Sequence, residues 1–128
     1  MKVVILAGGK GTRLSEYTKK IPKPMVQIKG VPLIIYIMKH YAKYGYTDFI
    51  IASGYKHNYI KNFFANKSFE WKIKIVNTGI NSMTGGRVRR LKNILKNQKF
   101  FLTYGDGLSN VNLKKLLKFH NSTKSYAT

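Results

Sequence analysis

Short apolar runs alternate along this chain with stripes of apolar residues at helical spacing. Residues 2–7 form a β-branched apolar run that ends in glycines, which is typical of a buried strand entering a turn. Similar runs lie at 49–52 and 100–104, whereas at 71–75 apolar residues alternate with lysines and predict a half-exposed or edge strand. The helical stripes are Leu33, Ile34, Ile37, Met38 and Tyr41; Ile60, Phe63 and Phe64; Val88, Leu91, Ile94 and Leu95; and Leu113, Leu116, Leu117 and Phe119.

Four strands that alternate with four helices predict the α/β class, with a Rossmann-like, mostly parallel sheet covered by helices on both faces. We expect residues 1–128 to form one domain. Residues 8–30, rich in Gly, Lys and Pro, predict a long loop with little regular structure, followed by a helix that has Pro32 in its first turn and stops at Gly45. Gly85-Gly86 are expected in a second loop.

Composition leaves two interpretations of the charge. The 24 Lys and Arg residues against four Asp and Glu give a formal charge of +20, which suits an anionic partner but also suits a lysine-rich codon bias. Cysteine is absent, so disulfides and thiolate metal sites are excluded. The first apolar run is too short for a signal peptide, and no run approaches the roughly 18 residues of a membrane span, so we expect a cytoplasmic protein without membrane contact.

The most informative stretch is Leu6-Ala7-Gly8-Gly9-Lys10-Gly11-Thr12-Arg13-Leu14. Its glycines allow the backbone to approach a ligand closely and to point N–H groups at it, while Lys10 and Arg13 add positive charge. The Walker pattern does not occur, and the dinucleotide pattern fails because Leu14 stands where its third glycine belongs. The stretch therefore predicts a different phosphate-binding loop, with a flexible turn as the alternative.

Two further residues are candidates for phosphate and metal chemistry. Lys23 lies between Pro22 and Pro24, which stiffen the backbone around it, so it loses little entropy on meeting an anion; a solvated lysine is the alternative. Magnesium prefers carboxylate oxygens, and of the four acidic residues only Asp106 ends an apolar strand at the expected ligand-binding edge. A turn-forming Asp-Gly pair is the alternative for Asp106.

The pattern L-A-G-G-x-G-T-R-L followed by P-K-P-M resembles the signature of sugar-1-phosphate nucleotidyltransferases. The resemblance implies that residues 6–12 wrap the nucleotide and that Arg13 and Lys23 contact the triphosphate and stabilise the leaving pyrophosphate. It also implies that Asp106 holds Mg²⁺ against the phosphates. Arg13, Lys23 and Asp106 are thus the expected catalytic residues.

The segment from Thr78 to Arg87 resembles T-G-x-x-x-M-T-G-G-R of the glucose-1-phosphate cytidylyltransferase branch. The likeness adds Ser82, Arg87 and Gly105 to the expected nucleotide-binding residues; a solvated loop and helix start is the alternative. The chain departs from that branch in two ways. The stretch between Asn66 and Trp71 is much shorter, and a second Asp expected from the C-terminal half has no counterpart.

The resemblance covers nearly the whole chain but only about the first half of a family member, so we expect a domain truncated at its C-terminus. It implies transfer of a cytidylyl group from CTP to glucose 1-phosphate, a reaction that needs no general base. An inactive nucleotide-binding fragment is the main alternative. A basic nucleic-acid-binding domain is another, but no motif supports it, so we expect no nucleic-acid partner. A homo-oligomer and a separately encoded C-terminal half remain open as partners.

Overall fold

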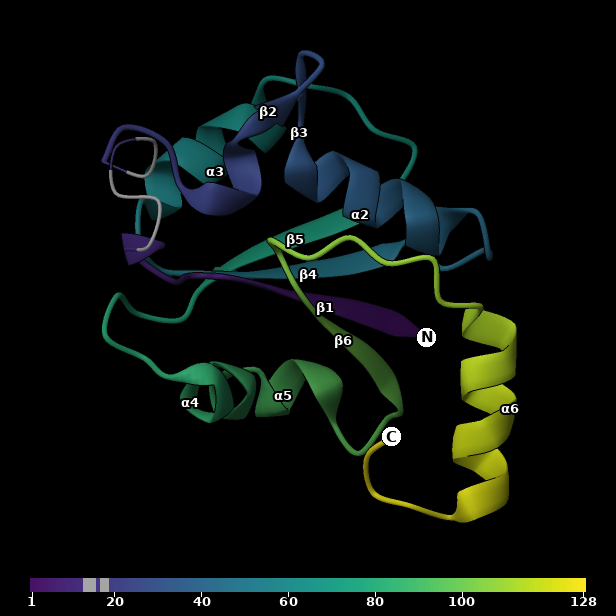
Figure 1. The fold of residues 1–128 in the computed structure, drawn as a ribbon. Helices are drawn as coiled ribbons and strands as arrows, with labels where there is room; N and C mark the ends of the chain where they lie inside the picture. Colours follow the sequence, from purple (N-terminus) through teal and green to yellow (C-terminus); the bar gives the residue numbers. More distant parts are fainter. Residues whose placement is uncertain (13–15, 17–18) are drawn as a thin grey trace.

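Four parallel strands form the central sheet of the computed structural model, which describes residues 1–12, 16 and 19–128 (Figure 1). They are β1 (Lys2–Ala7), β4 (Asp48–Ser53), β5 (Lys72–Asn77) and β6 (Phe100–Tyr104), in the order β5-β4-β1-β6. The predicted α/β class is confirmed. The alternation of lysines with apolar residues in β5 is explained by its place at one edge of the sheet.

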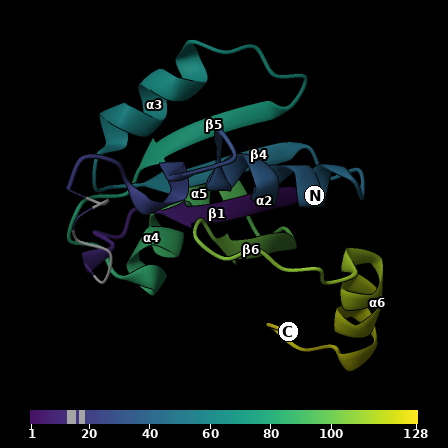
Figure 2. The same cartoon turned by 45° about the horizontal axis from the view of Figure 1, so that its top comes forward.

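Side chains of successive strand residues enter two separate cores. In β1, Val3, Ile5 and Ala7 pack on one face, and Val4 and Leu6 pack on the other, because strand side chains alternate. The first core is covered by α2 (Leu33–Ala42), α3 (His57–Ala65) and α6 (Leu113–Thr123), and the second by α4 (Thr84–Arg90) and α5 (Lys92–Leu95). Helices therefore cover both faces, as predicted (Figures 1 and 2).

The direction of the chain through the sheet reverses at β1. From β1 the chain moves by way of α2 to β4 and by way of α3 to β5, and then crosses through α4 and α5 to β6 on the far side of β1. Right-handed crossovers in opposite directions place their helices on opposite faces. A crevice is expected at the carboxyl ends of β1 and β6, where the order reverses.

Residues 8–30 contain more regular structure than predicted. A 3₁₀ turn, η2, spans Lys23–Met25, and a short hairpin pairs β2 (Gln27–Ile28) with β3 (Val31–Pro32). Its two-residue turn, Lys29 and Gly30, has positive φ at both positions (50° and 76°), as in type I′ turns. Such strands are too short to give an alternating pattern, so the prediction of an irregular loop was wrong here.

Two helix starts also differ from the prediction. Gly85 and Gly86, expected in a loop, lie in the first turn of α4, and Pro32 precedes α2 instead of lying in its first turn. Glycine is a poor helix former, but tertiary bonds of Arg87, described below, hold α4 in place. The stripe from Val88 to Leu95 is divided between α4 and α5 at Leu91.

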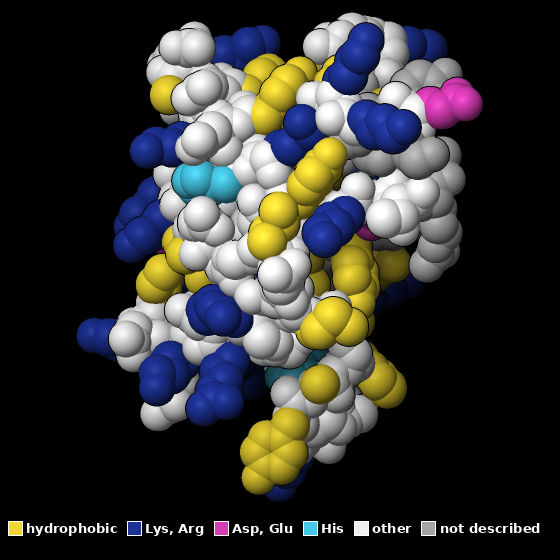
Figure 3. Space-filling view, turned by 90° about the vertical axis from the view of Figure 1, so that its left-hand side faces the viewer, with side chains coloured by type: hydrophobic (Ala, Val, Ile, Leu, Met, Phe, Trp, Pro, Cys, Tyr) yellow, Lys and Arg dark blue, Asp and Glu magenta, His cyan; other side chains and the backbone are white. Residues whose placement is uncertain are grey.

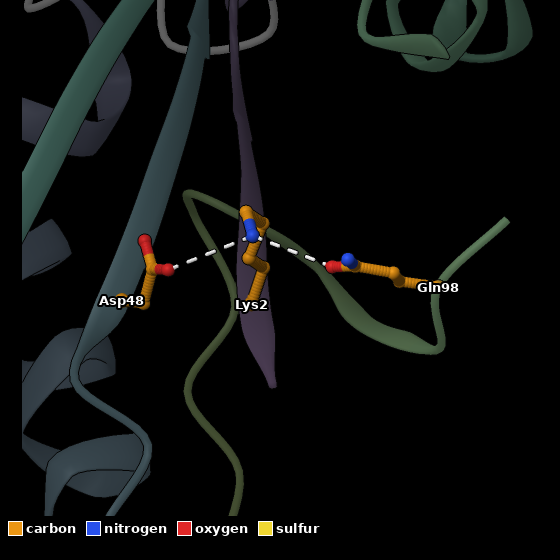
Figure 4. A network of polar contacts seen from close by, with 3 residues as sticks. All are labelled: Lys2, Asp48 and Gln98. Atoms are coloured by element: carbon orange, nitrogen blue, oxygen red, sulfur yellow. Dashed lines mark hydrogen bonds and ion pairs between the residues drawn. The ribbon is translucent and has the colours of Figure 1, made fainter. Parts of the chain in front are cut away.

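The amino end of the sheet is closed by a small polar network (Figure 4). The Lys2 Nζ lies 3.8 Å from Asp48 Oδ2 and donates to Gln98 Oε1 at 3.4 Å. Asp48 is therefore far from the carboxyl ends of the strands. In both ribbon views α6 also lies at this end (Figures 1 and 2). Among the described residues, no helix has the length and apolarity needed to cross a membrane.

Candidate functional site

A pocket of about 260 Å³ opens at the carboxyl ends of β1 and β6. Nine of the residues predicted from the sequence line it: Leu6, Ala7, Gly8, Gly9, Gly11, Lys23, Ser82, Arg87 and Asp106. Lys10, Thr12 and Gly105 are described but are not part of its lining, and Arg13 lies outside the described residues. The motif residues of the sequence therefore lie at the crevice that the strand order predicts.

The glycine loop is held in place through the main-chain carbonyl of Gly8. The carbonyl of Gly8, a buried residue, accepts a hydrogen bond from the Tyr55 N–H at 3.2 Å and another from Arg87 Nη2 at 2.7 Å. A Cβ at Gly8 would overlap the Arg87 guanidinium. Gly11 has a φ of 62°, which favours glycine. Glycine is required here for close packing as well as for ligand approach.

Arg87 is buried and joins three strand ends. Its Nη1 donates to the Gly79 carbonyl at 2.7 Å, to Thr78 Oγ1 at 2.9 Å and to the Ser53 carbonyl at 3.3 Å. Burial, and secondly the nearby charge of Arg90, lowers the pKa of the Arg87 guanidinium from its ordinary value. Arg87 lines the pocket, and it also has a structural role that was not evident from the sequence.

Lys23 and Asp106 form an ion pair across 83 residues of sequence, with Lys23 Nζ 2.7 Å from Asp106 Oδ2. Lys23 lies in η2, which is anchored by buried Met25 and by a bond from the Met25 N–H to the Pro22 carbonyl at 2.8 Å. Asp106 lies two residues beyond Tyr104, the last residue of β6. Both side chains remain about one-third exposed (33% and 37%), so both are accessible from the pocket.

Gly105 positions Asp106 without lining the pocket itself. Its N–H donates to the Leu6 carbonyl at 2.8 Å, which extends the pairing of β6 with β1 by one residue. A Cβ at this position would lie 2.9 Å from Pro24 Cγ and 3.0 Å from the Leu6 carbonyl oxygen. The absence of a side chain lets the end of β6 approach the Lys23 turn closely.

Substitution of Gly105 by alanine is expected to lower the free energy of unfolding by about 1–3 kcal/mol, because the added methyl group overpacks the contact with Pro24. Urea denaturation monitored by circular dichroism measures this change. Gly107→Ala is the matched control, since a Cβ there meets no atom of the described residues within 4 Å. Equal stability of the two variants would contradict the close packing described for Gly105.

The pocket is suited to an anion and, within the described part of the chain, offers a metal ion a single carboxylate ligand. Figure 3 looks onto this end of the sheet and shows Lys and Arg side chains spread over the surface. Among the described residues, Asp106 is the only acidic one in the lining, and no three or more His, Cys, Asp or Glu side chains form a group that could hold a metal. One carboxylate fits Mg²⁺, which is commonly bound by one or two carboxylates together with substrate phosphates.

Four residues of the lining were not predicted as contacts: Pro24, Met83, Thr84 and Tyr104. Met83 and Thr84 lie between Ser82 and Arg87, which were predicted from the sequence. Their position in the same segment could have indicated that they also line the pocket. Tyr104 is 59% exposed at the end of β6, although it is part of an apolar run that suggested burial. Its exposure follows from the edge position of β6.

Residues 2–128 match the Nucleotidyl transferase family, and the chain belongs to that family. It is 40% identical over 149 residues to a probable glucose-1-phosphate cytidylyltransferase of Bacillus subtilis. It is 44% identical over 151 residues to the glucose-1-phosphate cytidylyltransferase of Salmonella typhimurium. Both alignments cover all of this chain and 59% of the relative, so the chain spans less than two-thirds of their length.

A solved structure has a similar fold. HddC from Yersinia pseudotuberculosis, in complex with GMP-PN, is 31% identical with a TM-score of 0.79, over 93% of this chain and 53% of that one. The mostly parallel α/β arrangement is therefore that of nucleotidyltransferases.

Proposed function

We propose that this chain forms the nucleotide-binding part of a glucose-1-phosphate cytidylyltransferase. In this reaction a phosphate oxygen of glucose 1-phosphate bonds to the α-phosphorus of CTP. The bond between the α-phosphorus and its bridging oxygen to the β-phosphate breaks, and pyrophosphate leaves with that bond's electron pair. The products are CDP-glucose and pyrophosphate. The observation that carries the proposal is the pairing of Lys23 with Asp106 at the rim of the glycine-loop pocket.

The chemistry requires positioning and neutralisation of charge more than proton transfer, because a sugar phosphate is already an anionic nucleophile. In this proposal Lys23 leaves the Asp106 carboxylate and binds a phosphate of the nucleotide. Main-chain groups of the glycine loop bind the remaining phosphate oxygens. The role expected for Arg13 stays a prediction, because this residue lies outside the described part of the chain.

Asp106 would hold Mg²⁺ jointly with the nucleotide phosphates. When bound, the cation would supply positive charge near the α-phosphate and the leaving pyrophosphate. The ion pair between Lys23 and Asp106 keeps both side chains beside the pocket. On nucleotide binding, Lys23 would exchange Asp106 for a phosphate, and Asp106 would exchange Lys23 for Mg²⁺. Both side chains would then act on the same triphosphate.

The preference for CTP and glucose 1-phosphate is supported by the two cytidylyltransferase relatives at 40% and 44% identity. HddC, in complex with GMP-PN, is less similar in sequence at 31%. The fold alone accommodates different bases, so the choice of nucleotide has to be measured.

The test is pyrophosphate release from CTP and glucose 1-phosphate by the purified chain with Mg²⁺, with UTP, GTP and dTTP in parallel. We expect CTP to be preferred by about tenfold or more, a typical discrimination between similar substrates. Preference for another nucleotide would overturn the cytidylyl assignment while retaining the transferase class. Binding of CTP without turnover would favour the second candidate below.

The second candidate is a nucleotide-binding fragment that needs a separate polypeptide for activity. One observation favours it: β6 lies at an edge of the sheet with Leu102 (46%) and Tyr104 (59%) exposed. An exposed edge strand is a template for pairing with another strand. Addition of the C-terminal part of the Bacillus subtilis relative as a separate chain is expected to restore pyrophosphate release if this candidate is correct.

A further inference from the structure

A second and larger groove, of about 630 Å³, lies between α3 and the edge strand β5. Its lining comprises His57, Lys61, Phe64, Ala65, Lys67, Ser68, Phe69, Trp71, Ile73, Ile75 and Asn77. Its residues are different from those that line the pocket at β1 and β6. The volume falls within the range of roughly 300–1,000 Å³ of small-molecule sites.

The groove is open because the end of one core is left uncovered. Ile73 and Ile75 are in register with the fully buried Phe49 and Ile51 of β4, yet they remain only half-buried. The alignments to the two cytidylyltransferases run over 149 and 151 positions against 128 residues here, so those relatives carry 21 and 23 residues that this chain lacks. The sequence resemblance places the shortening between Asn66 and Trp71, directly beside the groove.

Aromatic rings form much of the groove. Phe69 and Trp71 are stacked, with ring centroids 5.8 Å apart and an interplanar angle of 18°, and the Phe64 ring centroid lies 5.5 Å from that of Phe69. Such rings provide apolar surface and prefer offset or edge contacts with a further flat ring. A ligand that buries an aromatic ring here would gain both area and ring contacts.

The polar part of the groove is basic. Lys61 and Lys67 are exposed in its lining, and within the described chain no acidic side chain lines it. His57 is fixed by a 2.7 Å contact between its Nδ1 and Ser53 Oγ. Because the Ser53 hydroxyl donates its proton to the Val76 carbonyl at 3.1 Å, His57 Nδ1 is the donor to Ser53. The charges of Lys61 and Lys67 favour a negatively charged group beside the aromatic rings.

We propose that the groove between α3 and β5 is a binding site for a small aromatic anion, a ring that carries a carboxylate, sulfonate or phosphate. A second copy of this chain would bring its own lysines to the rim and a formal charge of +20, so self-association through this groove is opposed by charge. The site is separate from the nucleotide pocket and does not depend on the proposed transferase activity.

The sole tryptophan of the chain, Trp71, lies in the groove and provides the measurement. The probe is 8-anilinonaphthalene-1-sulfonate, whose emission is excited by energy transfer from tryptophan. We expect saturable binding at one site per chain. The uncharged analogue N-phenyl-1-naphthylamine is expected to bind about tenfold more weakly, because it cannot interact with the lysines.

The double variant Lys61→Gln/Lys67→Gln is expected to weaken binding of the probe about fivefold to tenfold, as two exposed charge contacts are lost. Lys72→Gln/Lys74→Gln is the matched control, because these exposed lysines alternate with Ile73 and Ile75 and are absent from the groove lining. Lys23→Ala, in the nucleotide pocket, is expected to leave probe binding unchanged. Equal binding by the uncharged analogue, equal loss in the control pair, or unsaturable binding would each overturn the proposal.

Discussion

Replacement of Arg87 by alanine is expected to lower the free energy of unfolding by about 3 kcal/mol or more, the largest loss of stability anticipated for a single side chain of the pocket. Arg87 is 5% exposed and donates to oxygens of Gly8, Ser53, Thr78 and Gly79. Its loss leaves a cavity and buried acceptors without their donor. Because these oxygens belong to the ends of β1, β4 and β5, three strand ends lose one shared anchor.

Urea denaturation of the purified variant measures this loss, with Arg89→Ala as the matched control. Arg89 lies in the same helix but is exposed, so its removal is expected to change stability by less than about 0.5 kcal/mol. The Arg87→Lys variant is expected to recover only part of the stability, because an ammonium group cannot reproduce the planar set of bonds. If Arg87→Ala were as stable as Arg89→Ala, the anchoring role would be wrong.

The second large effect is expected from Asp106→Ala, which should lower the rate of pyrophosphate release about 10²-fold to 10³-fold, the range found when a single group that stabilises developing charge is removed. This expectation rests on the proposed role of Asp106 as the residue that holds Mg²⁺. The same variant should change the free energy of unfolding by less than about 1 kcal/mol, since an ion pair this exposed contributes little to stability.

Asp48→Ala provides a matched control for Asp106→Ala. Asp48 is also paired with a lysine, Lys2, at 3.8 Å, but it is the first residue of β4 and lies at the opposite end of the sheet. Its removal is expected to leave the rate of pyrophosphate release within about twofold of the parent, because it lies away from the reacting phosphates. A similar fall in both variants would indicate a general loss of folded protein and not the loss of a metal ligand.

Much of the fold follows from local patterns. The apolar run at 2–7, the lysine alternation in β5 and the helical stripes predicted the order of strands and helices, because burial imposes periods of 2 and 3.6 residues on a sequence. The position of the pocket also followed, since glycine-rich turns after parallel strands meet at one edge of the sheet. The hairpin after η2 was missed because two-residue strands are too short to show a period.

The sequence by itself determined the α/β class, the glycine loop, and Lys23 and Asp106 as separate candidates, because each depends on residues close together in the chain. Only the tertiary structure decided that Lys23 and Asp106 lie 2.7 Å apart and that Arg87 anchors three strand ends. It also decided that Gly105 is needed for contact with Pro24 and that an aromatic groove lies open beside β5. These features join residues distant in sequence, and such contacts depend on how strands and helices pack, for which a local pattern carries no information.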